Sequence, residues 1–137
     1  MSKVFYILVN NDIKMSPGKL AAQCGHPVTE MLFSSLEKKE IIDYMDEEKT
    51  VASRVRYERD FSDIVIEWKN EGQIKIVLSA SQKLLESLEE RSDVYPIRDL
   101  GLTELKPNTL TCIGIGPVDK NNLPNEFEFL KKLELYK

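Results

Sequence analysis

Four polar residues are spaced so that they share one face of a helix, and they are the first candidates for chemistry in this chain. They stand at positions i, i+4, i+7 and i+11: Lys19, Gln23, His26 and Glu30. Lys19 falls in the first turn of such a helix, where free backbone N–H groups and the helix dipole also favour a negatively charged ligand. The same stripe is typical of the solvent-facing side of an ordinary amphipathic helix. The spacing alone leaves both interpretations open.

A second candidate set lies in a loop between two predicted strands. Asp99, Gly101 and Thr103 follow directly after a strand predicted over residues 95–97 and precede another over 110–115. Loops at strand ends often carry functional groups on a rigid scaffold. Aspartate and glycine are also common turn residues, because the carboxylate binds nearby backbone N–H groups and glycine tolerates a positive φ. Here too, a functional and a purely structural interpretation stay open.

The helix that carries Lys19 has a well-defined predicted start. The run Val4 to Val9 is rich in β-branched and aromatic residues, which predicts a buried strand before the turn. Ser16 suits the N-cap, and Pro17 suits the first helical position, where its missing N–H removes no helical bond. Pro27 lies inside the helical pattern and predicts a kink or an early end of the helix.

The rest of the chain predicts strands and helices in alternation. A strand is expected over 74–78, then a helix capped by Ser79 with Gln82 three residues later, and a final helix at about 125–135. Alternation of this kind predicts an α/β protein, a three-layer α/β/α architecture with a mixed sheet of about four strands.

The middle of the chain is predicted to be helical. Ser34 with Glu37 three residues on has the spacing of a capping box, and the apolar residues of 36–45 and 50–69 are assigned to helices. The sequence Val55-Arg56-Tyr57 is also compatible with the start of a strand. We expect an extended helical segment at about 35–65.

Composition bounds the class of protein. At 137 residues with 42% hydrophobic residues, we expect one globular domain over 1–137. The first apolar run is too short to cross a bilayer, which favours a soluble, cytoplasmic protein without a membrane partner. Cys24 and Cys112 have no paired spacing, so two reduced, buried thiols are expected rather than a disulfide or zinc site.

The charge balance argues mildly against nucleic-acid binding. The net charge is −4 and the pI is about 5.1, whereas proteins that neutralise phosphates usually present a basic surface. A local basic patch is still compatible with these values. Its candidate residues are Lys14, Lys19, Arg98 and Lys106.

Several familiar catalytic motifs are missing from the sequence. It has one histidine and no Gly-x-Ser-x-Gly, and Cys24 and His26 stand at i and i+2, which do not face each other on a helix. Gly18-Lys19 is not a phosphate-binding P-loop, because Ile13 replaces the required glycine and Leu20 replaces the hydroxyl residue. A nucleophilic triad and a P-loop are therefore not expected.

Three sequence blocks, taken in order, resemble the type 2 (archaeal and eukaryotic) peptidyl-tRNA hydrolase family. The first is Asn11-Asp12, Lys14-Met15, Gly18-Lys19, Ala21-Ala22-Gln23 and His26. The second is Trp68 followed by Glu71-Gly72-Gln73-Ile74-Lys75-Ile76-Val77-Leu78. The third is Ile97-Arg98-Asp99, Gly101, Thr103, Pro107, Thr109, Thr111 and Ile115-Gly116-Pro117.

This resemblance implies hydrolysis of the ester between a peptide and the terminal ribose of tRNA, with peptidyl-tRNA as substrate. It implies no metal and no organic cofactor, and relatives often form homodimers. The residues that match the family's catalytic positions are Lys19, Asp99, Thr103 and Thr111. Those that match substrate-binding or supporting positions are Asp12, Gln23, His26, Arg98 and Thr109.

Three departures from the family pattern keep a second function in view. Pro27 stands where the family usually has a small residue after the helix histidine, Leu102 where it often has arginine, and Asn108 where it often has glycine. The alternative is a non-catalytic module on the same scaffold that binds an RNA end or a protein. The joint presence of Lys19, Asp99 and Thr103 favours the enzyme, whereas the acidic balance and Leu102 favour the binding module.

Overall fold

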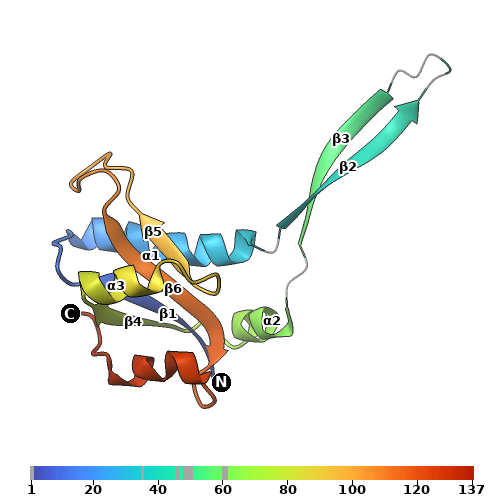
Figure 1. Ribbon diagram of the computed structural model, residues 1–137. Helices are drawn as coiled ribbons and strands as arrows, with labels where there is room; N and C mark the ends of the chain where they lie inside the picture. Colours follow the sequence, from blue (N-terminus) through green and yellow to red (C-terminus); the bar gives the residue numbers. More distant parts are fainter. Residues whose placement is uncertain (1, 35, 46, 48–50, 60–61) are drawn as a thin grey trace.

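A mixed four-stranded sheet forms the centre of the molecule (Figure 1). The computed structural model describes residues 2–34, 36–45, 47, 51–59 and 62–137. The strands lie in the order β4 (Lys75–Ala80), β1 (Lys3–Asn10), β6 (Leu110–Asp119) and β5 (Tyr95–Arg98). β1 pairs with β4 in parallel, and β6 is antiparallel to both β1 and β5. The predicted mixed sheet is confirmed.

Helices cover both faces of this sheet. Alternate residues of β1 point to opposite faces, because successive side chains of a strand do so. Phe5 and Ile7 pack in the cluster that includes residues of α1 (Pro17–Phe33) and α2 (Asp63–Asn70). Tyr6 and Leu8 pack in the cluster that includes residues of α3 (Gln82–Leu88) and the 3-10 helix η1 (Asn125–Lys132). The predicted three-layer α/β/α architecture is confirmed.

α1 starts as predicted, but it does not end early at Pro27. Ser16 is the N-cap and its Oγ accepts from the backbone N–H of Lys19, with Pro17 at the first helical position. The helix runs through Pro27 to Phe33. Pro27 is buried, and a Cβ at Gly114 of β6 would lie only 2.5 Å from Pro27 Cβ. The absence of that side chain lets the proline-containing turn pack closely on the sheet.

The middle of the chain is a β-hairpin, so the predicted helical segment at about 35–65 is wrong over most of its length. β2 (Leu36–Met45) pairs antiparallel with β3 (Val51–Arg59), and Figure 1 shows the pair projecting away from the body between α1 and α2. Each strand carries β-branched residues and a tyrosine among its charged residues, and such residues favour strands. Cross-strand pairing then overrides the weak helical spacing. Among the described residues of this segment, only those of α2, at its end, are helical. Ser34 caps the end of α1 instead of starting a helix.

Smaller differences concern caps, element ends and thiols. Ser81, not Ser79, is the N-cap of α3, because β4 continues to Ala80 and leaves Ser81 as the first residue free to cap. The C-terminal helix is a 3-10 helix that ends at Lys132. Both cysteines are free, with Cys112 buried and Cys24 half-buried. Predictions that fall on residues 35, 46, 48–50, 60 and 61 lie outside the described residues.

Candidate active site

Lys19 and Asp99 meet in one site, although 80 positions separate them in the chain. Lys19 comes from the first turn of α1, and Asp99 follows the end of β5. Lys19 Nζ donates to Asp99 Oδ1 at 2.7 Å. The Lys19 side chain is 11% exposed and that of Asp99 is 6% exposed, so the ion pair is shielded from water. The interaction between the two charges is correspondingly strong.

The carboxylate of Asp99 is held by donors on both oxygens. Besides Lys19, the Nε2 group of Gln23 donates to Oδ1 at 3.0 Å, and the backbone N–H of Gly101 donates to Oδ2 at 2.8 Å. The hydrogen bond from Lys19 lowers the pKa of Asp99 below its ordinary value, and the bonds from Gly101 and Gln23 act in the same direction. Asp99 is therefore an ionised carboxylate at neutral pH and a weak base.

Thr103 completes the environment of the ammonium group. Lys19 Nζ donates to Thr103 Oγ1 at 2.8 Å. An ammonium group has three N–H donors, and two of them bond Asp99 and Thr103. Within the described ranges the third has no protein acceptor. Thr103 is exposed at the edge of the site. One N–H of Lys19 and the hydroxyl hydrogen of Thr103 are thus available to a substrate or to water.

Gln23 and Thr111 form a buried support behind the carboxylate. Thr111 Oγ1 donates to Gln23 Oε1 at 2.6 Å, while the Nε2 group of Gln23 donates to Asp99. Both residues are buried, with Thr111 at 0% exposure. Thr111 was predicted among the catalytic residues, yet it reaches Asp99 only through Gln23. The hydroxyl of Thr111 thus bonds the amide that binds the carboxylate.

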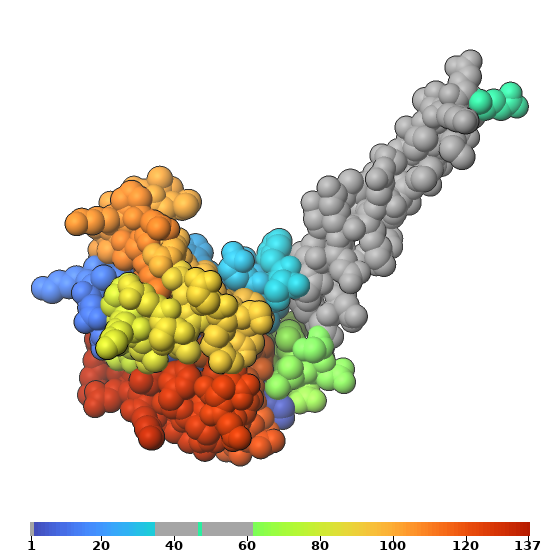
Figure 2. Space-filling model, viewed as in Figure 1, coloured from blue at the N-terminus to red at the C-terminus, as the bar shows by residue number. Residues whose placement is uncertain are grey.

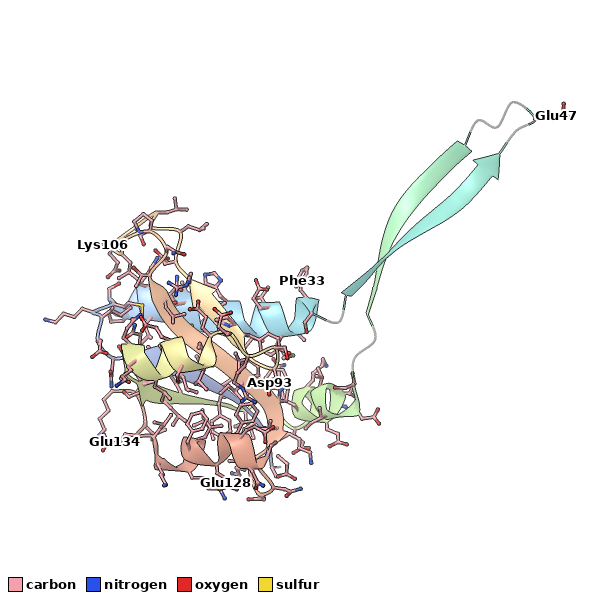
Figure 3. All side chains as sticks on the ribbon, viewed as in Figure 1. Phe33, Glu47, Asp93, Lys106, Glu128 and Glu134 are labelled. Atoms are coloured by element: carbon pink, nitrogen blue, oxygen red, sulfur yellow. The ribbon has the colours of Figure 1, made fainter. Side chains whose placement is uncertain are left out.

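The loop from Leu100 to Asn108 lies beside the residues that lead into α1 (Figures 2 and 3), and its Thr103 contacts Lys19 of the first helical turn. In Figure 2 the orange loop stands out from the body beside the blue residues that lead into α1, and Figure 3 labels Lys106 on the same loop. Its ends are closed by backbone bonds, from Asp99 N–H to Thr109 O at 2.8 Å and from Asn108 N–H to Asp99 O at 2.6 Å. Asn108 has φ of 67°, a conformation that asparagine tolerates better than most residues, which explains why it can stand where the family often has glycine.

His26 lies beside this site and lines a shallow groove of about 280 Å³. The other lining residues come from α1, β5 and the residues after it: Thr29, Glu30, Pro96, Ile97, Arg98 and Leu100. Leu100 and Leu102, on the same loop, are 77% and 81% exposed. The polar stripe of α1 is therefore divided: Lys19 and Gln23 contact Asp99, whereas His26 and Glu30 face the groove.

Three residues predicted to bind substrate or support the site make hydrogen bonds to other parts of the protein. Asp12 Oδ2 accepts from the backbone N–H of Gln82 at the start of α3. Arg98 makes a two-point ion pair with Glu89 and donates from Nη1 to the carbonyl of Asn108 at 2.6 Å. Thr109 Oγ1 donates to Lys106 O at 2.7 Å. These contacts brace α3 and the loop.

Glu104 is a site neighbour that the sequence did not single out. Its Oε1 accepts from Ser16 Oγ at 2.6 Å, and its Oε2 accepts from the backbone N–H of Ser16 at 3.0 Å. The hydrogen bonds from Ser16 lower the pKa of Glu104. A carboxylate one residue after Thr103, together with a predicted N-cap serine, was the only available signal, and neither residue type is specific.

An ammonium group, an ionised carboxylate and a hydroxyl converge here, and these are groups that can stabilise an oxyanion and orient water. The fold and the site thus define an α/β protein with a candidate ester-hydrolysing centre. The chain belongs to the peptidyl-tRNA hydrolase PTH2 family, whose family model, described as "Peptidyl-tRNA hydrolase PTH2", matches residues 3–136.

Curated archaeal relatives agree with this assignment. The chain is 39% identical over 117 residues to a protein of Staphylothermus marinus named peptidyl-tRNA hydrolase, a match that covers 81% of this chain and 78% of the relative. It is 34% identical over 133 residues to one of Methanococcus vannielii with the same name, covering 93% and 96% of the two chains. A Methanopyrus kandleri protein of that name is 36% identical over 117 residues, 81% of each chain. In the described part of this chain, none of the helices is long and apolar enough to cross a membrane.

Proposed function

We propose that this protein hydrolyses the ester between a peptide and the 3′-terminal ribose of tRNA, using the site formed by Lys19, Asp99 and Thr103. The family and the names of the relatives support the reaction. The observation that carries the assignment of residues is the shielded ion pair, with Lys19 Nζ 2.7 Å from Asp99 Oδ1 and 2.8 Å from Thr103 Oγ1.

Lys19 is the electrophilic group of the proposed mechanism. Its remaining N–H is directed to the ester carbonyl oxygen, where negative charge develops as water attacks the carbonyl carbon. Asp99 holds the ammonium in place through the hydrogen bond from Lys19 Nζ. Because Asp99 is stabilised as an anion by three donors, we assign it to orienting the water and not to a full proton abstraction.

Thr103 positions the second reactant. Its oxygen accepts from Lys19, so its hydroxyl hydrogen is left to donate to the attacking water or to the substrate. In the overall step a bond forms between the water oxygen and the carbonyl carbon, and the bond from that carbon to the ribose oxygen breaks. One proton of the water ends on the ribose oxygen, which leaves as the tRNA 3′-terminal hydroxyl. The peptide carboxylic acid releases the other proton to solvent and becomes a carboxylate.

N-blocked aminoacyl-tRNA is the direct test substrate. Wild-type protein is expected to release free tRNA, and both Lys19→Ala and Asp99→Asn are expected to lower kcat/KM by about 100-fold or more, the usual cost of removing a preorganised charge-stabilising group. Lys132→Ala, an exposed lysine on η1, is the matched control and should retain activity.

Two results would contradict the proposal. Absence of ester cleavage by the folded wild type would select a non-catalytic role on the same scaffold. Full turnover by Asp99→Asn would remove Asp99 from the mechanism.

We also place the enzyme in the cytoplasm, where a translation-related substrate would be met. A homodimer remains a prediction, and light scattering on the purified protein tests it.

A further inference from the structure

The amino end of α1 is fastened to the loop after β5 by two adjacent loop residues. Glu104 binds Ser16 with both carboxylate oxygens, taking one hydrogen from the hydroxyl and one from the backbone N–H. Thr103, the residue before it, accepts from the side chain of Lys19. Ser16 Oγ also accepts from the backbone N–H of Lys19, at 3.3 Å. The two loop residues thus contact the two ends of the same helical turn.

The position of Thr103 depends on such contacts because the middle of this loop is exposed. Residues 102–104 are all exposed, whereas the backbone bonds that close the loop lie at its ends, around Asp99 and Asn108. A hydroxyl on an exposed segment has many accessible orientations, and fixing it costs conformational entropy. The two hydrogen bonds between Glu104 and Ser16 offset this entropy cost, because they fix the residue next to Thr103.

We propose that Glu104 is a positioning residue of the hydrolytic site, which acts through Ser16 to hold the Thr103 hydroxyl against Lys19. The inference rests on the proposed function of Lys19 and Thr103. In the described residues both carboxylate oxygens of Glu104 bind Ser16 and neither bonds Lys19 Nζ or Asp99, although the Glu104 charge also acts on Lys19 through space. Glu104→Gln removes that charge and keeps an acceptor for Ser16, so it separates the two effects. The effect of Glu104 is on how often Thr103 is in place when substrate is bound.

A positioning role predicts a loss in kcat with little change in KM. Glu104→Ala is expected to lower kcat on N-blocked aminoacyl-tRNA by about 10-fold, within the range that a small misplacement of a catalytic group produces, while KM stays within about twofold. Glu104→Gln keeps one acceptor oxygen for Ser16, so it should lower kcat by less than Glu104→Ala does. Glu134→Gln, an exposed glutamate near the C-terminus that Figure 3 labels far from this loop, is the matched control.

A double-mutant cycle separates positioning from general stabilisation of the loop or helix. In a Thr103→Val background, where no hydroxyl is left to position, adding Glu104→Ala should lower kcat by less than about twofold further. Ser16→Ala removes the hydroxyl contact and the N-cap but keeps the backbone N–H that Glu104 binds, so it should cause only part of the kcat loss of Glu104→Ala. Thermal unfolding of every variant shows whether the fold is intact.

Unchanged kcat in Glu104→Ala would overturn the proposal, as would an equal loss in the wild-type and Thr103→Val backgrounds. If Glu104→Ala does not fold, Glu104→Gln decides between the same outcomes. Failure of the proposed function looks different, because the wild type itself would then cleave no ester.

Discussion

The thiol of Cys112 donates to the backbone carbonyl of Gln23, with Sγ 3.5 Å from the oxygen. In an uninterrupted helix that carbonyl would accept from the N–H of residue 27, but Pro27 has none. Burial raises the pKa of Cys112 to about 12, so the thiol keeps its hydrogen at neutral pH and remains a donor. Cys112 of β6 therefore supplies a donor in place of the N–H that Pro27 lacks. The acceptor belongs to Gln23, whose side chain binds Asp99.

Cys112→Val should destabilise the protein by about 1–2 kcal/mol, because it removes the thiol donor from the carbonyl of Gln23, a buried residue. In a Pro27→Ala background, the new N–H at residue 27 can serve that carbonyl, so the same substitution should cost less. Urea unfolding of the four proteins of this cycle measures the coupling. Equal costs in the two backgrounds would show that the thiol does not compensate for the proline.

Thr111→Val should reduce both stability and turnover. The substitution removes the donor to the buried Gln23 Oε1, at a cost of about 1–3 kcal/mol, and it frees the amide to turn away from Asp99. Thr111→Ser retains the hydroxyl and should recover most of the lost kcat. Unfolding and ester hydrolysis are measured side by side. If the serine variant is as inactive as the valine variant, Thr111 does not act through its hydroxyl.

The lowered pKa of Asp99 gives the protein a defined response to acid. Because the folded-state pKa lies below the ordinary value of 3.8, the ionised carboxylate stabilises the fold above that value, and this contribution is lost as pH falls from 3.8 through the folded-state pKa. Asp99→Asn should therefore flatten the acid limb of the stability curve. For the same reason kcat should show no decrease from Asp99 between about pH 7 and 5. An acid limb of the stability curve that is the same in the wild type and in Asp99→Asn would contradict the assignment of Asp99 as the ionised group.

Gly101→Ala should disrupt the loop that carries Thr103. Gly101 has φ of 77°, and a Cβ there would lie 2.6 Å from Pro107 N, so both the backbone conformation and the space exclude a side chain. We expect a destabilisation of at least about 1–2 kcal/mol and a large loss of kcat, read from unfolding and hydrolysis assays.

Gly25→Ala is the matched control for this substitution. Gly25 is a helical glycine of α1 with nothing within 4 Å of a Cβ, so alanine should raise stability by about 0.5–1 kcal/mol. A Gly101→Ala variant with normal stability and kcat would show that the loop tolerates another conformation.

Local patterns in the sequence were sufficient for the elements whose signals are local. The apolar run of β1, the Ser16 cap with Pro17, and the alternation of strands and helices each depend on neighbouring residues, and the structure agrees with them. The three ordered motif blocks were enough for the family, and the matched family model confirms it. The middle segment failed because its apolar spacing was ambiguous over a short range and pairing between β2 and β3 decided it.

Local sequence patterns determined the site only in part. The sequence supplied Lys19, Asp99 and Thr103 as candidates, but their meeting depends on α1 packing across the sheet next to β5 and β6. Burial then decided the remaining roles: Thr111 lies behind Gln23, and the Cys112 thiol completes the helix at Pro27. Glu104 reaches Ser16 across 88 positions of chain, a contact that no local spacing encodes. Residue types fix which chemistry is possible, whereas the packing of distant elements fixes which of those groups lie within hydrogen-bond distance.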